Sequence, residues 1–160
     1  MGANITIDNE RESGGEALAD IRVRAASLRG TSFGGEIIPR LIDEIPILAV
    51  AALFADGDTV ISGAAELRVK ETDRLAAVTT ELNRLAPGAV EAKEDGMVIH
   101  GGRMLSPASC RTYDDHRMAM SLAVAGAAGE GVTLDAPSCV NISYPSFYET
   151  LDGLVQQGER

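Results

Sequence analysis

At residues 66–74 the chain reads Glu66-Leu67-Arg68-Val69-Lys70-Glu71-Thr72-Asp73-Arg74. Apolar residues then recur at spacings of three and four positions, which predicts an amphipathic helix with one buried face; they are Leu75, Val78, Leu82 and Leu85. Thr72 is the predicted N-cap of this helix. Asp73 suits its first turn, because a carboxylate there complements the positive end of the helix dipole.

The cations at the start of this helix need an explanation. Arg74 falls in the first turn, where a positive charge opposes the helix dipole at a cost of about 0.3–1 kcal/mol. Lys70 and Glu71 lie close by in the chain. A bound anion would offset this cost, because backbone N–H groups and cations would hold it together. The alternative is a solvated charged turn in which Glu71 and Arg74 form an ion pair three residues apart.

The same arrangement recurs at a second helix. Asp114, Asp115, His116 and Arg117 precede a nearly continuous apolar segment, 118–128, and Arg117 is again a cation in a first turn. Taken singly, Asp115 fits an ordinary N-cap, and His116 fits a structural role as well as a functional one. Two such cations have a common cause if both serve one anion-binding site.

A third helix start carries Asp43. The apolar segment 47–54 predicts a helix buried on all sides, with Pro46 in its first turn and Gly57 after its end. Asp43 by itself also fits an N-cap. If the helices are related by rotation, their starts converge on one place. That place would offer cations for a multiply charged anion and carboxylates for acid–base chemistry.

Composition and charge exclude several classes of function. The chain has 160 residues, 45% of them hydrophobic and 4% aromatic, so one domain with an aliphatic core is expected. A net charge of −10 makes nucleic acid an unfavourable partner. The longest apolar run, 45–55, is too short to span a membrane. Cys110 and Cys139 give neither a disulfide framework nor a metal-ligand spacing, which fits a reducing cytoplasm.

The remaining segments predict short strands that alternate with the helices. Residues 9–15 and 106–110 are expected to be loops, and a last helix should begin at Pro145. Strands are expected at 5–7, 20–24, 37–42, 59–61, 90–92, 97–100 and 132–134. A hairpin turn is expected at Asp95-Gly96. This order predicts an α/β (α+β) fold.

Part of this order occurs twice. Residues 55–60 match residues 129–134, with Gly131 lying 74 positions after Gly57, and the same shift aligns Thr72 with Ser146. A spacing this long is not a solenoid repeat. It predicts two duplicated strand–helix–strand–helix units, 1–86 and 87–160, packed around shared buried helices. Gly2 resembles the C-terminal cap of a preceding helix, which suggests a fragment of a longer protein.

Three motifs resemble those of the 5-enolpyruvylshikimate-3-phosphate (EPSP) synthase family, also called 3-phosphoshikimate 1-carboxyvinyltransferases. They are Leu67-Arg68-Val69-Lys70-Glu71-Thr72-Asp73-Arg74-Leu75, then Tyr113-Asp114-Asp115-His116-Arg117-Met118-Ala119-Met120, and Pro39-Arg40-Leu41-Ile42-Asp43-Glu44-Ile45-Pro46 followed by Ala51-Ala52-Leu53-Phe54-Ala55. The similarity extends over nearly the whole chain and keeps the family's order. It implies a two-domain enzyme, each domain built of repeated α/β units around buried parallel helices. Residues 1–160 would form part of its C-terminal domain, with the N-terminal domain absent.

The resemblance also implies an activity. The family transfers the enolpyruvyl group of phosphoenolpyruvate to the 5-hydroxyl of shikimate 3-phosphate and releases phosphate. It does so by addition and elimination, without a metal or an organic cofactor. The reaction is a cytoplasmic step toward chorismate and the aromatic amino acids, and the enzyme is the target of glyphosate. Because half of the cleft would be missing, the chain alone is expected to have negligible activity.

Roles for individual residues follow from the same resemblance. Asp43 is a candidate base for the attacking hydroxyl, and Glu71 is a candidate for proton transfer at the methylene carbon of phosphoenolpyruvate. Lys70 is expected to act in both catalysis and binding. The phosphate and carboxylate of phosphoenolpyruvate would be bound by Lys70, Arg74, His116 and Arg117, with Asp115 orienting this group.

The chain departs from the family pattern at two positions. Ile142 stands where many members have a lysine before the final Ser/Thr-aromatic-Pro, so one expected cation is missing. Glu66 stands where some members have an asparagine that contacts the shikimate, and it is expected to contact a substrate hydroxyl instead.

Two alternatives remain open on the sequence. An enolpyruvyl transferase that acts on UDP-N-acetylglucosamine has the same scaffold, but the intact motifs at 70–74 and 114–120 disfavour it. A non-catalytic phosphate-binding domain would use the same cations without needing Glu71, so a Glu71→Gln variant distinguishes it from an enzyme.

Overall fold

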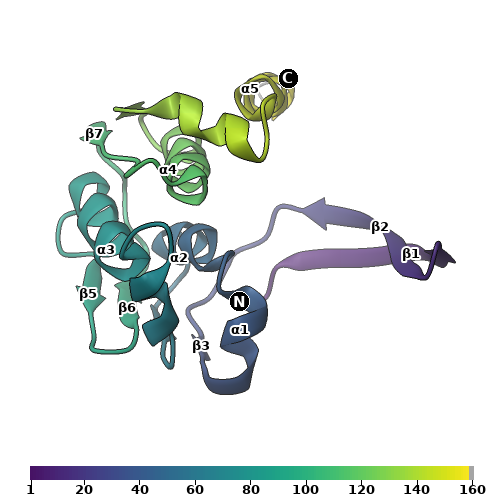
Figure 1. The fold of residues 1–160 in the computed structure, drawn as a ribbon, viewed down its shortest axis with the longest axis horizontal. Helices are drawn as coiled ribbons and strands as arrows, with labels where there is room; N and C mark the ends of the chain where they lie inside the picture. The colour runs from purple at the N-terminus through teal and green to yellow at the C-terminus, as the bar shows by residue number, and fades with distance from the viewer. Residues whose placement is uncertain (159–160) are drawn as a thin grey trace.

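The computed structural model describes residues 1–158. Its first two strands, β1 (Asn4–Ser13) and β2 (Glu16–Arg24), form an antiparallel hairpin that projects from the rest of the chain (Figure 1). Gly14 and Gly15 turn the hairpin with φ values of 62° and 84°, the left-handed conformations that a tight turn between twisted strands requires. Apolar side chains lie opposite one another on one hairpin face and stay more than half exposed: Ile5 with Val23, and Ile7 with Ile21.

The hairpin corrects the loop predicted at 9–15, because β1 continues through this segment to Ser13. Cross-strand contacts hold it there: Asn9 Nδ2 donates to Asp20 Oδ2 at 2.7 Å, and Arg11 Nη1 lies 3.2 Å from Asp20 Oδ1. The strand register shifts at a bulge between Asp8 and Arg11, where Asn9 has a φ of 53°, and pairing resumes on both sides of it.

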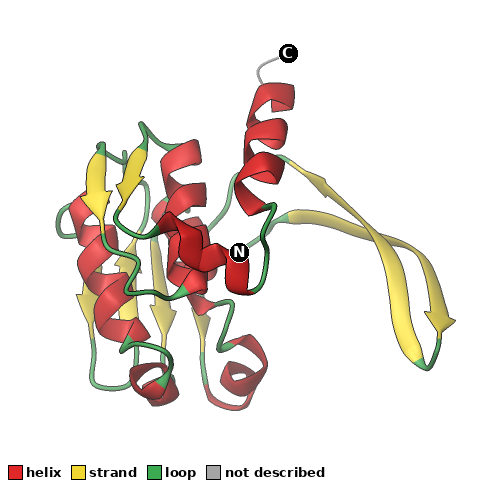
Figure 2. Cartoon of the chain, turned by 45° about the horizontal axis from the view of Figure 1, so that its top comes forward, coloured by secondary structure: helices red, strands yellow, loops and turns green. Residues whose placement is uncertain are grey.

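A four-stranded sheet supports the helices that carry the charged motifs. β3 is parallel to β4, and β6 is antiparallel to both of its neighbours. The predicted strands at 59–61, 90–92 and 97–100 are confirmed in it. The sheet order is β3 (Ser32–Phe33), β4 (Asp58–Ile61), β6 (Met97–His100) and β5 (Val90–Ala92). Two helices pack against it (Figure 2), α2 (Ile45–Leu53) on β6 and α3 (Arg74–Leu85) on β5.

The later part of the chain has the same order of elements. In the earlier part, β3, α2, β4 and α3 follow one another, and β3 is parallel to β4. In the later part, β7 is parallel to β8, and the elements are β7 (Ala108–Cys110), α4 (His116–Ala128), β8 (Val132–Leu134) and α5 (Phe147–Gly158). Helices α2 and α4 pack against each other, so the two parts share a core.

Three local predictions are wrong at their boundaries or in their type. Residues 37–42 are helical: a 3-10 helix at Gly35–Ile37 leads into α1 (Ile38–Leu41). Pro39 lies in the first turn of α1, where its missing N–H has no helical partner to lose. The loop predicted at 106–110 contains β7, which needs β8 as its partner. The last helix begins at Phe147, two residues after the predicted Pro145.

The core is aliphatic, as the composition predicts, and a few polar side chains are buried with it. Helices α2, α3 and α4 and the four-stranded sheet contribute to one apolar cluster. The buried polar residues are Thr59, Arg74, Glu81, Thr112, Asp115 and Ser121. Every helix within residues 1–158 is too short or too polar to cross a membrane.

Thr59, on β4, provides a stability prediction. Its hydroxyl is the only buried side-chain polar atom in the described part of the chain that has no hydrogen-bond partner. A Thr59→Val variant keeps the β-branched shape and removes this unpaired group, so the free energy of unfolding should rise by about 1 kcal/mol. Urea denaturation followed by circular dichroism measures the change.

Thr112 supplies the matched control for this variant. Its buried hydroxyl donates to Asp135 Oδ1 at 3.0 Å, so Thr112→Val should lower the free energy of unfolding by about 1–3 kcal/mol. The expectation for Thr59 is wrong if Thr59→Val lowers the urea midpoint, as Thr112→Val should.

Candidate active site

Arg74 is the centre of the charged cluster. It is the first residue of α3, and its side chain is only 1% exposed. Its Nε donates to Asp115 Oδ2 at 2.7 Å, its Nη1 to Asp43 Oδ1 at 2.7 Å and its Nη2 to Glu71 Oε2 at 2.6 Å. Burial acts to lower the pKa of Arg74, but the hydrogen bonds to Asp115 and Asp43 outweigh it and raise that pKa.

Asp115 connects α4 to this centre. It is the N-cap of α4, as its position predicts, and its Oδ1 accepts from the backbone N–H groups of Arg117 at 2.8 Å and Met118 at 3.4 Å. The other carboxylate oxygen binds Arg74, and Asp115 is 0% exposed. One buried carboxylate therefore satisfies the start of α4 and neutralises Arg74 at the same time.

The N-caps of the other two helices differ from the prediction. The N-cap of α3 is Asp73 rather than Thr72, and its Oδ1 accepts from Ala76 N at 2.9 Å. Asp73 takes this position because it has non-helical backbone angles directly before the first helical residue. Asp43 is not the N-cap of α2: that residue is Glu44, whose side chain makes no capping bond. Asp43 is therefore free to face the cluster.

Asp43 lies among three cations. Its Oδ1 is 2.7 Å from Arg74 Nη1 and 3.8 Å from Lys70 Nζ, and its Oδ2 is 3.9 Å from Arg117 Nη2. The hydrogen bond from Arg74 and the charges of Lys70 and Arg117 hold the pKa of Asp43 below its usual value, against the opposing effect of burial. Asp43 is therefore an ionised acceptor at neutral pH.

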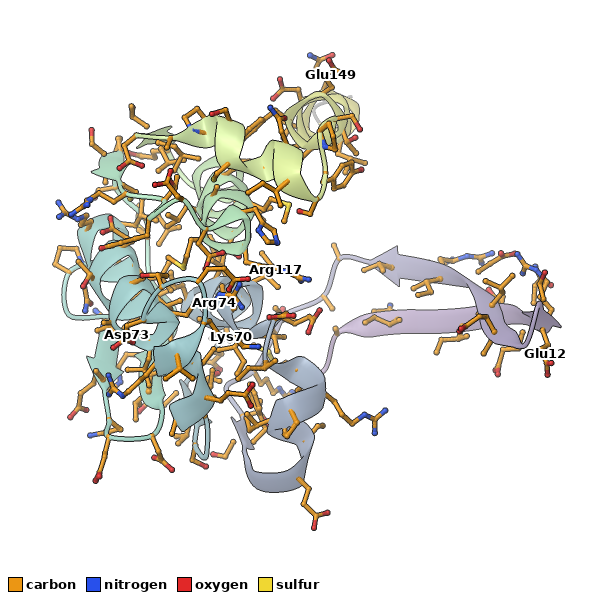
Figure 3. The ribbon with its side chains drawn as sticks, in the orientation of Figure 1. Glu12, Lys70, Asp73, Arg74, Arg117 and Glu149 are labelled. Atoms are coloured by element: carbon orange, nitrogen blue, oxygen red, sulfur yellow. The ribbon has the colours of Figure 1, made fainter. Side chains whose placement is uncertain are left out.

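The rest of the cluster is more exposed to solvent. Lys70 Nζ lies 3.5 Å from Glu66 Oε1, and Arg117 Nη1 lies 3.4 Å from Glu44 Oε1. Figure 3 shows Lys70, Arg74 and Arg117 gathered in one region of the molecule. The side chains of Lys70 and Arg117 keep 24% and 35% of their surface exposed, so these two cations remain accessible to a ligand.

The cluster contains more carboxylates than cations. The cations are Lys70, Arg74 and Arg117, whereas the carboxylates are Asp43, Glu44, Glu66, Glu71 and Asp115. Three of these carboxylates pair with Arg74 at the start of its helix. An anionic ligand would have to bind mainly through the accessible cations or displace existing ion pairs.

The remaining predicted residues fall into three groups. His116 is the first residue of α4 and is half-buried next to Arg117. His100 lies on β6, with its Nδ1 2.9 Å from Asp58 Oδ1, and is partly exposed. Cys110 is buried, Cys139 is half-buried, and both are free thiols.

Sequence reasoning missed Glu44 and a buried group around Glu81. Glu44 pairs with Arg117, and no local signal distinguished it from any carboxylate near a helix start. Glu81 did have a signal, because it stands on the apolar stripe of α3 between Val78 and Leu85. Charged residues are almost never fully buried unless they have partners, so a Glu on that stripe predicts a specific contact.

A small hollow adjoins the cluster. It has a volume of about 180 Å³ and is lined by Asp43, Glu44, Arg117, Phe147 and neighbouring residues of α2 and α4. Ligand pockets usually measure about 300–1,000 Å³. Larger hollows of about 420 and 390 Å³ lie beside β8, away from the charged cluster. The cluster, rather than either of these two larger hollows, holds the titratable groups suited to chemistry.

Comparisons with known proteins agree with the motifs. The chain is 56% identical over 158 residues to a 3-phosphoshikimate 1-carboxyvinyltransferase of Gloeobacter violaceus, covering 98% of this chain and 36% of that protein. It is 55% identical to the protein of the same name from Desulforudis audaxviator, again covering 36% of that protein. The chain thus spans little more than a third of the length of these relatives.

A solved structure leads to the same family. The EPSP synthase of Acinetobacter baumannii matches with a TM-score of 0.88 and 36% identity, over 97% of this chain and 36% of that one. The family model described as EPSP synthase (3-phosphoshikimate 1-carboxyvinyltransferase) matches residues 1–151. The chain therefore belongs to the EPSP synthase family.

Proposed function

We propose that the charged cluster is part of the active site of an enolpyruvyl transferase that joins phosphoenolpyruvate to the 5-hydroxyl of shikimate 3-phosphate. The observation that carries the proposal is the position of Asp43, an ionised carboxylate held between Lys70, Arg74 and Arg117. A base and a set of anion-binding groups are thereby placed next to each other, as a reaction between two phosphorylated substrates requires.

In this reaction Asp43 and Glu71 each transfer one proton. Asp43 accepts the proton of the 5-hydroxyl as its oxygen attacks C2 of phosphoenolpyruvate, and Glu71 gives a proton to the C3 methylene. The resulting tetrahedral intermediate then loses a proton from C3 to Glu71 and releases phosphate, which carries away the proton held by Asp43, and the enolpyruvyl ether remains. Glu71 can take part because its side chain is 51% exposed while one oxygen is fixed by Arg74 at 2.6 Å.

Some of the cations bind phosphoenolpyruvate, and Arg74 orients the carboxylates around it. Lys70, Arg117 and His116 bind the phosphate and carboxylate of phosphoenolpyruvate. Arg74 makes four hydrogen bonds to carboxylates and is buried, so it orients Asp43, Glu71 and Asp115. Glu66, 3.5 Å from Lys70, either orients that lysine or receives a substrate hydroxyl.

A second polypeptide segment is needed to complete this site. The hollow beside Asp43 is too small for both substrates, and the relatives are almost three times as long as the chain. We propose that the part of the enzyme outside residues 1–160 binds the shikimate 3-phosphate and supplies the cation that is absent at Ile142. The cluster holds more carboxylates than cations, which also disfavours a non-catalytic phosphate-binding domain.

Phosphate release from phosphoenolpyruvate plus shikimate 3-phosphate tests the proposal. The chain is assayed alone and then with the N-terminal remainder of the Gloeobacter violaceus relative as a separate polypeptide. Release is expected only with the partner. Glu71→Gln should then reduce the rate by about 10²–10⁴-fold while phosphoenolpyruvate still binds.

Four outcomes would contradict the proposal or part of it. Release that depends on UDP-N-acetylglucosamine would assign the other enolpyruvyl transfer. No release from a folded, assembled pair, or an unaffected Glu71→Gln variant, would favour a non-catalytic role. Turnover by the chain alone, in a preparation free of host enzyme, would show that the second segment is not required.

A further inference from the structure

Glu81 is a buried carboxylate that the proposed chemistry does not use. It lies on α3 and is 0% exposed. Its Oε1 accepts from the Tyr113 hydroxyl at 2.7 Å, and its Oε2 accepts from the backbone N–H of Arg111 at 3.1 Å. Arg84, one turn further along α3, lies 3.0 Å from the same oxygen. Two of these partners belong to the segment that precedes α4, so Glu81 connects α3 to that segment.

Helix α3 holds this segment at both of its ends. Arg74 and Glu81 are seven residues apart, two helical turns, and so lie on the same face of α3. Arg74 binds Asp115 at one end of the segment, and Glu81 binds Arg111 and Tyr113 at the other. The contacts of one helix face therefore fix the position of residues 111–115 relative to the start of α3.

The segment between these attachments is strained. Tyr113 and Asp114 are consecutive non-glycine residues with φ values of 58° and 54°, a conformation that costs about 1–2 kcal/mol per residue. Such a turn persists only where its surroundings hold it. On its other side, Asp135 accepts from the backbone N–H of Thr112 at 2.8 Å and from the Thr112 hydroxyl at 3.0 Å.

The strained turn determines where the side chains at the start of α4 lie relative to the charged cluster. Asp115 follows it directly, and His116 and Arg117 begin the helix that Asp115 caps. If the turn relaxed, Asp115 would move away from Arg74, and Arg117 would move away from Asp43. A displacement of this kind has large effects on chemistry, because misplacing reacting groups by about 1 Å can cost about 10²-fold in rate.

We propose that Glu81 is a positioning residue of the active site, which acts through Tyr113 to hold the strained turn that delivers Asp115 and Arg117 to Arg74 and Asp43. This inference rests on the proposed function for its effect on rate, but its effect on geometry is independent of turnover. Glu81 itself touches no substrate. The role of the buried Glu81 carboxylate is to hold residues 111–115 in place, and it transfers no proton in the reaction.

The test uses two variants and a matched control. Tyr113→Phe removes only the hydroxyl, and Glu81→Met keeps an unbranched side chain of similar length but removes both acceptor oxygens. Asn83→Ala is the control, since Asn83 lies on the same helix and makes two hydrogen bonds with the Val90 backbone, at 2.8 and 3.0 Å, none of them to residues 111–115. All three variants remove partly buried hydrogen bonds, so all three should lower the free energy of unfolding.

The first readout is solvent exchange of the Arg74 Nε–H, measured by NMR on the chain itself. This proton is buried in the bond to Asp115, so its exchange reports the loop geometry directly. Exchange should accelerate about tenfold in Tyr113→Phe and in Glu81→Met, and the double variant should add little, because both variants remove the hydrogen bond between Tyr113 and Glu81. Asn83→Ala should leave it unchanged.

The second readout is kcat/KM for phosphate release with the partner polypeptide. It should fall about tenfold or more in Tyr113→Phe and Glu81→Met and stay within about twofold in Asn83→Ala. Unchanged Arg74 exchange in Tyr113→Phe, or equal acceleration in Asn83→Ala, overturns the positioning role. If the parent pair shows no turnover while exchange shifts as expected, the proposed function fails and the positioning role stands.

Discussion

Arg74→Met should lower the free energy of unfolding of the chain by about 3–5 kcal/mol. The reason is the pairing with Asp115, which is 0% exposed and would be left as a buried carboxylate without its cation. Asp43 and Glu71 lose the same partner, but they are about half exposed and can be solvated. Arg74→Lys should be almost as costly, because one ammonium cannot reproduce a planar guanidinium that contacts three carboxylates. Urea denaturation at pH 7 measures the loss.

Two further variants show whether the buried charge is the cause. Arg22→Met removes an arginine that is 64% exposed and 3.8 Å from Asp8, and it should change stability by less than about 1 kcal/mol. In an Asp115→Asn background the loss on Arg74→Met should shrink, because the uncompensated charge is already gone. If Arg74→Met costs no more than Arg22→Met, the cluster does not depend on this ion pair.

Asp43→Asn should reduce kcat for phosphate release by about 10²–10⁴-fold in the chain paired with its partner polypeptide. The amide keeps an acceptor for Arg74 but cannot take the hydroxyl proton. Stability should change by less than about 1 kcal/mol, because the Asp43 side chain is 42% exposed. Glu44→Gln is the matched control: it removes a neighbouring carboxylate that pairs with Arg117, and it should alter kcat by less than about threefold.

The pH dependence of stability provides a second measurement on Asp43. Its pKa is lower in the folded chain than the ordinary value of 3.8, so the folded state holds its proton less tightly than the unfolded state. The stabilisation is therefore present above pH 3.8 and is lost as the pH falls through the lowered pKa. The parent and Asp43→Asn should differ at pH 7 and converge at the acid end. A difference that grows on acidification would contradict the assigned ion pairs.

Much of the fold could be predicted because its signals are local. The apolar spacing after Arg74 fixed helix α3, and the Asp95-Gly96 turn fixed the β5–β6 hairpin. Residues 37–42 could not be assigned in this way, because a short apolar run with one proline fits a strand edge or a first helical turn equally well. β7 could not be predicted either, since a three-residue strand exists only through its partner β8.

For the site, the sequence by itself determined which residues would gather. Cations and carboxylates at three helix starts belong to motifs of fixed spacing, so Asp43, Glu71, Arg74 and Asp115 could be named as neighbours before any contact was known. Only the tertiary structure decided what they do to one another: Arg74 is buried and occupied by three carboxylates, and Lys70 and Arg117 are the cations left accessible. The physical reason is that burial and pairing depend on how α2, α3 and α4 meet, and electrostatic effects follow from those distances rather than from sequence spacing.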